Sequence, residues 1–280
     1  MIAAVAGTGG ARRRFVAPPR EQVAAERFAH PLFAGLLPFH ELLTARDWPS
    51  VAAMDACLAL DGKRLVEQDD ALLADGLHYE QRIAGGAIAT RRDNWHDLFN
   101  ALVGERYPAV KRALNARQCA RIEANGPSQR DRAQAALTQF DESGVIVRVQ
   151  DAALVQAWDA HDWQGLFVDE ASAWRDGRIG VAAVIGHALM EQGLLPDRLL
   201  VGKCLVVQGE GDAQCVASIA DGIAAARVLD DPLELRPLPL MGISGWHPLQ
   251  DATFYRQADY FRPLREGRRY PLLQGHDQRS

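Results

Sequence analysis

The feature that most constrains the fold is the alternation of short apolar runs with longer helical patterns. Runs rich in Val, Ile or Leu predict strands, and the segments between them carry the apolar spacing of helices. The expected strands lie at residues 63–68, 86–90, 145–149, 178–185 and 203–208. The main expected helices lie at residues 94–103, 108–124, 128–140, 151–160 and 215–229. This order predicts an α/β or mixed α+β fold, a helix-rich single domain around a small mixed sheet, and the uneven spacing leaves the strand order open.

Prolines set a different expectation for the last fifth of the chain. Long regular elements are excluded after Asp231 by Pro232, Pro237, Pro239, Pro248 and Pro263. The same stretch carries Trp246, Phe254, Tyr255 and Phe261, which are too apolar to stay in water. We therefore expect an extended segment packed over the body. The resulting domain division is a flexible leader at 1–25, one globular domain at 26–270 and a flexible tail at 271–280.

Composition excludes several classes of protein. The chain has 280 residues, of which 48% are apolar and 24% charged, as in ordinary globular domains. No apolar run approaches the roughly 18 to 20 residues of a membrane-spanning helix. No secretory signal is recognisable, and the four cysteines are scattered singly, which predicts reduced thiols and a cytoplasmic location. A net charge of −5 argues against nucleic-acid binding by the whole surface. The sequence also leaves open whether the chain forms a homo-oligomer.

A set of spaced motifs carries a resemblance to a known family. The motifs begin with Tyr79-Glu80, Arg82-Ile83, Thr90-Arg91 and Asn94 to Leu102, and continue with Leu114-Asn115-Ala116, Phe140 to Gly144, Gly186 to Leu189 with Glu191, Gly245-Trp246 and Phe261-Arg262-Pro263. In this order they resemble an uncharacterised, largely proteobacterial family, the domain of unknown function 3025, over about residues 28 to 265. Gly104 and Gln118 depart from the pattern, which favours a bulky residue and a His there. The resemblance implies no activity, because none is established for the family.

His96 and Asp97 are the first candidate site residues. They lie near the start of an expected helix, where Asp93 or Asn94 would cap it. A His-Asp dipeptide occurs in metal phosphohydrolases, but it recurs here as His161-Asp162 and His276-Asp277, so the dipeptide alone is weakly specific. The structural alternative is a helix N-terminus with a hydrogen-bonded histidine.

His187 and Glu191 are the candidate metal ligands. They stand four apart on an expected helix directly after the strand at 178–185, at what we expect to be the end of a parallel strand, where sites collect in α/β sheets. Such a pair can share one divalent ion or one proton, although chance alone produces about one pair of this spacing in a chain of this composition. A helix-start histidine satisfied by the backbone is the structural alternative.

Asp141 and Glu142 complete the candidate catalytic set. Adjacent carboxylates can bind a metal or divide acid and base roles, because one negative charge raises the pKa of the other. We expect them on a turn, Asp141 to Gly144, that feeds a strand, and a solvated turn is the structural alternative. Tyr79, Glu80, Arg82 and Arg91 could supply an anion-binding or proton-shuttling group, or form ordinary surface ion pairs.

Three functions stay open on the sequence. The first is a hydrolase-type enzyme whose pocket gathers His96, Asp97, Asp141, Glu142, His187 and Glu191, with a divalent metal or plain acid-base catalysis. The second is an interaction protein that uses Trp95, Trp163, Trp246 and the C-terminal segment. The third is a nucleic-acid accessory protein that acts through the basic face at 106–132. The first requires the polar atoms of His96, Asp141 and His187 to lie within about 10 Å of one another.

Overall fold

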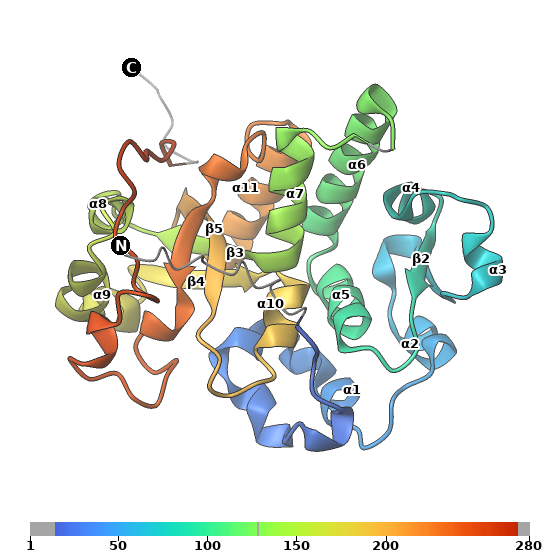
Figure 1. Cartoon of the computed structure of the whole chain (residues 1–280), viewed down its shortest axis with the longest axis horizontal. Coiled ribbons are helices and arrows are strands. Elements are labelled where there is room, and N and C mark those ends of the chain that lie inside the picture. The colour runs from blue at the N-terminus through green and yellow to red at the C-terminus, as the bar shows by residue number, and fades with distance from the viewer. Residues whose placement is uncertain (1–14, 128, 274–280) are drawn as a thin grey trace, which may run out of the picture.

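The computed structural model describes residues 15–127 and 129–273 as a mixed α+β protein (Figure 1). The helices are α1 His40–Thr44, α2 Val51–Cys57, α3 Asp70–Leu73, α4 Tyr79–Ala84, α5 Trp95–Arg106, α6 Pro108–Asn125, α7 Arg132–Ser143, α8 Ala153–Asp159, α9 Ala171–Arg175, α10 His187–Gln192 and α11 Asp212–Ala224. The strands are β1 Arg64–Glu67, β2 Ala87–Thr90, β3 Gly144–Val149, β4 Ile179–Val184, β5 Val201–Gln208 and β6 Arg236–Pro239. Short 3-10 or π turns are η1 Arg20–Gln22, η2 Ala25–Ala29, η3 Pro31–Phe39, η4 Leu60–Gly62, η5 Gly165–Asp169, η6 Pro232–Glu234, η7 Leu240–Gly242 and η8 Phe254–Arg256.

The main sheet has four strands in the order β4-β3-β5-β6. Strand β3 pairs with β5 in parallel and with β4 in antiparallel orientation, and β5 pairs with β6 in antiparallel orientation. Helices α7 and α11 lie on one face of this sheet, with α6 packed beside them (Figure 1). Strand β3 is buried on both faces except at the half-buried Arg148, which fits its β-branched residues Val145 to Val147 and Val149.

A second, two-stranded sheet lies apart from the first. Strands β1 and β2 pair in parallel, and together with α2, α3 and α4 they form the lobe at the right of Figure 1. Helices α5 and α6 lie between this lobe and the main sheet, because α4 packs on α6 and η4 packs on α5. The buried apolar residues nevertheless form one contiguous core that runs from Phe28 to Phe261.

Local sequence explains where the helices around the site begin. Asn94 caps α5 by accepting a hydrogen bond from Asp97 N, and Pro108 occupies the first position of α6. A capping box between Asp131 and Gln134 starts α7. Helix α11 begins at Asp212 and ends at Ala224, earlier at both ends than the sequence predicts.

Two expectations about the candidate site's surroundings were wrong. Asp141 and Glu142 do not lie on a turn, because α7 continues through Ser143 and β3 begins at Gly144. His187 does follow a strand, but β4 is an antiparallel edge strand, so the argument from a parallel strand end does not apply. The candidate residues meet for a different reason, which is the crossing of three helix ends.

The chain termini pack more fully than the sequence indicates. Arg20, within the expected leader, is buried and donates to Ala45 O and Leu42 O, so the body begins before residue 25. Residues 1–14, the rest of that leader, lie outside the described residues, as do residues 274–280 of the expected tail. The Pro-rich C-terminal segment packs on the body as expected, since Trp246, Phe254 and Phe261 are buried.

The described part of the chain, residues 15–127 and 129–273, contains no helix both long and apolar enough to cross a membrane. All four cysteines are free thiols, of which Cys204 and Cys215 are buried.

Candidate functional site

Three helix ends converge on one point. His96 lies in the first turn of α5, His187 is the first residue of α10, and Asp141 and Glu142 lie in the last turn of α7. Helix α10 packs on both α5 and α7, which brings these turns together. Carboxylates in the last turn of a helix lie at the negative end of its dipole, so the dipole of α7 disfavours the negative charges of Asp141 and Glu142. That placement requires positive partners nearby.

The two imidazoles contact each other directly. His187 Nε2 lies 3.0 Å from His96 Nε2, and the rings meet edge to face with centroids 4.4 Å apart. His187 Nδ1 lies 3.8 Å from Asp141 Oδ2, and His187 Nε2 lies 3.8 Å from Glu142 Oε2. The expected convergence of His96, Asp141 and His187 is therefore present in the structure.

The other nitrogen of each ring faces a carboxylate. His96 Nδ1 lies 3.2 Å from Glu191 Oε2, so Glu191 binds His96 and not His187, its neighbour on α10. His187 Nδ1 has no hydrogen-bond partner among the described residues, and Asp141 lies beside it. A carboxylate opposite Nδ1 favours the tautomer with its proton on Nδ1. Both Nε2 atoms then present a lone pair to the same small space.

Lys111 holds Asp141 in its charged form. Lys111 Nζ donates to Asp141 Oδ1 at 2.5 Å and to Asn100 Oδ1 at 2.8 Å, and Asn100 Nδ2 donates to the Tyr79 hydroxyl. Burial alone would raise the pKa of Asp141, but Lys111 and the nearby imidazoles outweigh burial and lower it. The sequence gives no signal for this pair, because Lys111 and Asp141 lie on different helices.

The pKa values of the two histidines are shifted in opposite directions. Burial lowers the pKa of His187 to about 3, because Asp141 only partly offsets the loss of hydration. Burial also disfavours charge on His96, but the hydrogen bond with Glu191 and the charges of Glu142, Glu191 and Asp97 together raise its pKa above the usual value. Burial raises the pKa of Glu142. Opposed shifts in one contact pair are typical of functional sites.

Asp97 points to a different partner. Its carboxylate accepts from the backbone N, Nε and Nη2 of Arg91 at 2.6, 2.9 and 2.7 Å. This fork fixes the loop after β2 to the start of α5, and it leaves Asp97 committed to Arg91. His96 and Asp97, which the sequence suggested as one candidate pair, therefore have different roles. His96 belongs to the histidine cluster, and Asp97 forms a structural ion pair with Arg91.

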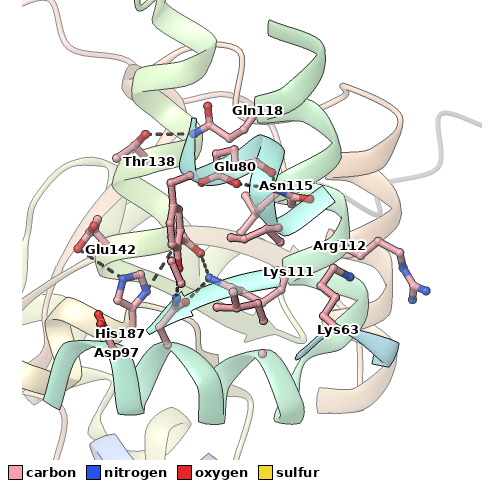
Figure 2. Close-up of a pocket in the computed structure, with 18 of the residues that line it drawn as sticks. Lys63, Glu80, Asp97, Lys111, Arg112, Asn115, Gln118, Thr138, Glu142 and His187 are labelled. Atoms are coloured by element: carbon pink, nitrogen blue, oxygen red, sulfur yellow. Dashed lines mark hydrogen bonds and ion pairs between the residues drawn. The ribbon is translucent and has the colours of Figure 1, made fainter. Parts of the chain in front are cut away.

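The histidine cluster opens into a cavity of about 470 Å³. The cavity lies between the β1-β2 lobe and helices α5, α6 and α7, and Figure 2 shows Glu80, Asn115, Gln118 and Thr138 around it. Its size falls within the range of small-molecule sites. Of these residues, sequence reasoning proposed only Glu80 as a site residue, because amides and hydroxyls carry no distinctive spacing.

Three side chains are placed to hold one metal ion. The ligand atoms of His96, Glu142 and His187 lie within 4.8 Å of one another. Two nitrogens bound at about 2.0 to 2.1 Å to one ion are about 3 Å apart, which matches the separation of the two Nε2 atoms. Glu142 needs a shift of about 1 Å to join them, and its side chain is 40% exposed. Glu191 and Asp141, which lie beside the Nδ1 atoms of His96 and His187, would then orient the two imidazole rings.

Stability of the metal-free protein is expected to depend on His187. Between about pH 3 and 6.5 the unfolded chain binds a proton at this residue that the folded protein excludes, so the free energy of unfolding falls as the pH falls. One such group gives a slope of up to about 1.4 kcal/mol per pH unit. His96, whose pKa is raised, acts in the opposite sense: it stabilises at low pH and loses its effect as the pH rises through that pKa.

Urea unfolding in the presence of a chelator, from pH 4 to 7, measures this slope. In His187→Asn the slope should become flatter, while in His40→Asn, which changes an exposed histidine, it should match the unchanged protein. An unaltered slope in His187→Asn would show that His187 is not buried as a neutral ring.

Comparison with known protein families identifies a match for most of the chain. Residues 63–265 match the family described as Protein of unknown function (DUF3025). No curated protein and no solved structure matches the chain. The matched range contains the whole histidine cluster together with Lys111, Asp141 and the main sheet. The chain therefore belongs to the DUF3025 family of proteins of unknown function.

Proposed function

We propose that the protein is a cytosolic hydrolase that binds a divalent metal ion, zinc first among the candidates, through His96, Glu142 and His187. The observation that carries the proposal is the 3.0 Å separation of two Nε2 atoms whose rings both direct Nδ1 at a carboxylate. Two facing lone pairs repel unless a proton or a cation lies between them. The free thiols support the cytosolic part.

The ligand set favours catalysis over a structural role. Two histidines and one glutamate leave a fourth coordination position, whereas structural zinc sites close all four with protein ligands. The open side faces a cavity large enough for a small substrate. A bound ion there would polarise a substrate oxygen or lower the pKa of a water molecule to about 7. Asp141 and Glu191 orient the imidazoles, and Lys111 keeps Asp141 charged.

The same cluster supports acid-base catalysis if a proton takes the place of the ion. His96, with its raised pKa, would donate from Nε2, and His187, with its lowered pKa, would accept. The two forms of the site differ in whether an ion or a proton lies between the two Nε2 atoms. Metal binding and protonation of His96 therefore compete for the same position.

The two other functions receive less support from the described residues. Trp95, Trp163 and Trp246 are buried, so they offer no exposed surface to a partner. Of the seven basic side chains that the sequence places on the 106–132 face, five form ion pairs with carboxylates: Lys111, Arg112, Arg117, Arg121 and Arg132. A face neutralised in this way has little charge left for nucleic-acid phosphates.

Zinc titration of metal-stripped, tag-free protein tests the proposal. We expect about one equivalent to bind, with release of a proton from His96 that increases as the pH is lowered, because ligands must be deprotonated. Calorimetry in buffers of different ionisation enthalpy measures the proton count. His187→Asn and Glu142→Gln should each weaken binding at least about tenfold, and His40→Asn should not.

Absence of zinc, manganese and iron binding in folded protein would contradict the metal proposal. The acid-base form would then remain, and it predicts that activity against ester and phosphoester panels requires both His96 and His187.

A further inference from the structure

The basic side chains of the cavity are unevenly neutralised. Arg91 is held by Asp97 and Lys111 by Asp141, so these two are already paired. At another part of the wall, Lys63 and Arg112 share a single carboxylate: Asp61 lies 3.7 Å from Lys63 Nζ and 3.2 Å from Arg112 Nη1. These three residues, which we call the Lys63 corner, carry one positive charge in excess.

Arg130 adds a further cation to the cavity wall. It contacts Thr138 Oγ1 at 3.3 Å and forms no ion pair with any described carboxylate. Glu80 also lines the cavity, and its carboxylate accepts a hydrogen bond from Asn115 Nδ2 at 2.7 Å. Burial raises the pKa of Glu80, which weakens it as a counter-charge. The cavity wall therefore carries excess positive charge, and the Lys63 corner is the part of it that lies away from the histidines.

The Lys63 corner and the histidine cluster lie toward opposite ends of α5. Leu60 N donates to Glu105 Oε2 at 2.7 Å, which anchors η4 near the C-terminal end of that helix, while His96 lies in its first turn. With a rise of 1.5 Å per residue, these two points are on the order of 13 Å apart. Figure 2 accordingly shows Lys63 and Arg112 at the right and His187 and Glu142 at the left.

Two amides of α6 that line the cavity present acceptors. Asn115 Nδ2 donates to the backbone oxygen and the carboxylate of Glu80, and Gln118 Nε2 donates to Gln134 O and Thr138 Oγ1. Because these partners include carbonyl and carboxylate oxygens, they fix which end of each amide carries the NH₂ group. Asn115 Oδ1 and Gln118 Oε1 accept no hydrogen bond from a described residue. Both residues line the cavity, so a ligand with hydroxyl or amino donors would match them.

We propose that the substrate of this site carries at one end a small hydroxylated anion, of the sugar-phosphate or sugar-acid class. The phosphate or carboxylate of this group binds Lys63 and Arg112, and its hydroxyl groups donate to Asn115 and Gln118. The bond that reacts lies beyond this group, at the histidine cluster. The proposal rests on the proposed function for the identity of the reactive end. Its binding contacts, however, do not involve the proposed metal ligands.

Calorimetric titration of metal-stripped protein separates the two proposals, because it measures ligand binding without the ion. The probes are glucose 6-phosphate, ribose 5-phosphate, glycerol 3-phosphate and gluconate, with glucose and inorganic phosphate as partial ligands. We expect at least one hydroxylated anion to bind about tenfold more tightly than glucose and than inorganic phosphate. A phosphate ester or gluconate as the best ligand identifies the anionic group.

The variant Lys63→Ala/Arg112→Ala should weaken that ligand at least about tenfold, as expected for the loss of a charge-assisted hydrogen bond. Arg106→Ala is the matched control: this exposed arginine forms no ion pair with a described residue and does not line this cavity, and its loss should leave binding within about twofold. If glucose binds as tightly as the phosphate esters, the Lys63 corner does not bind the anionic group. If inorganic phosphate binds as tightly as the esters, the proposed hydroxyl contacts are wrong. Failure of all four anionic probes at millimolar concentration, or equal losses in both variants, would overturn the proposal even if zinc binds.

Discussion

Deletion of residues 237–280 is expected to abolish cooperative folding, whereas deletion of residues 271–280 should shift the melting temperature by only a few degrees. The longer deletion removes most of β6, whose Leu238 is fully buried, and the apolar groups after it, among them Leu240, Met241, Phe254 and Phe261. Each such side chain contributes about 1.5 to 3 kcal/mol when buried, so their sum approaches the 5 to 15 kcal/mol that stabilises a typical domain.

Polar contacts add to this attachment. Trp158 Nε1 donates to Pro237 O, and the Tyr260 hydroxyl donates to Leu200 O and accepts from Met241 N. Circular dichroism and thermal melts of both truncations measure the effect. Phe254→Ala offers a milder test, since it should still fold and lose about 3 to 5 kcal/mol. A 237–280 deletion that melts like the full chain would show that the segment is a separable arm, and it would favour the interaction-protein function.

Gly186→Ala is expected to damage stability and the site together. A Cβ atom at this position would lie 2.6 Å from Ser143 Cα and 2.8 Å from Glu142 O, and both are backbone atoms that cannot move alone. Helices α7 and α10 would have to separate, which moves His187 away from Glu142. Overpacking of this kind costs about 1 to 3 kcal/mol. Zinc affinity should fall at least about tenfold, because ligand geometry is disturbed by a fraction of an ångström or more.

Gly211→Ala provides the control for this substitution. No heavy atom lies within 4 Å of a Cβ built there, and its backbone suits any residue. Its stability should change by no more than about 1 kcal/mol, and its zinc affinity should not change. If Gly186→Ala binds zinc like the unchanged protein while it is clearly destabilised, the three helix ends do not set the geometry of a metal site.

Much of the secondary structure follows from local sequence. The β-branched run of β3 predicts a buried strand, Pro108 marks the start of α6, and the prolines after Asp231 exclude long helices. The aromatic residues of the C-terminal segment also predict their own burial, because their apolar area is too large to leave in water. These features depend on side-chain chemistry within a few residues, which the sequence contains in full.

The candidate site depends on contacts that no local pattern encodes. The sequence identifies His96, Asp141, Glu142, His187 and Glu191 as chemically capable residues, but it pairs His187 with Glu191 and places the two adjacent carboxylates on a turn. The structure instead continues α7 to Ser143, brings His96 to His187 across 91 positions, and turns Glu191 toward His96. It also supplies Lys111 to Asp141 from another helix.

The physical reason for this division is the range of the forces involved. Helix and strand preferences act between neighbours along the chain, so composition and spacing reveal them. The tautomers and charges of the histidines depend on burial and on carboxylates delivered by α7 and α10, and burial exists only after the core has packed. Sequence alone determined which residues were able to do chemistry, and the tertiary structure decided which of them face one another.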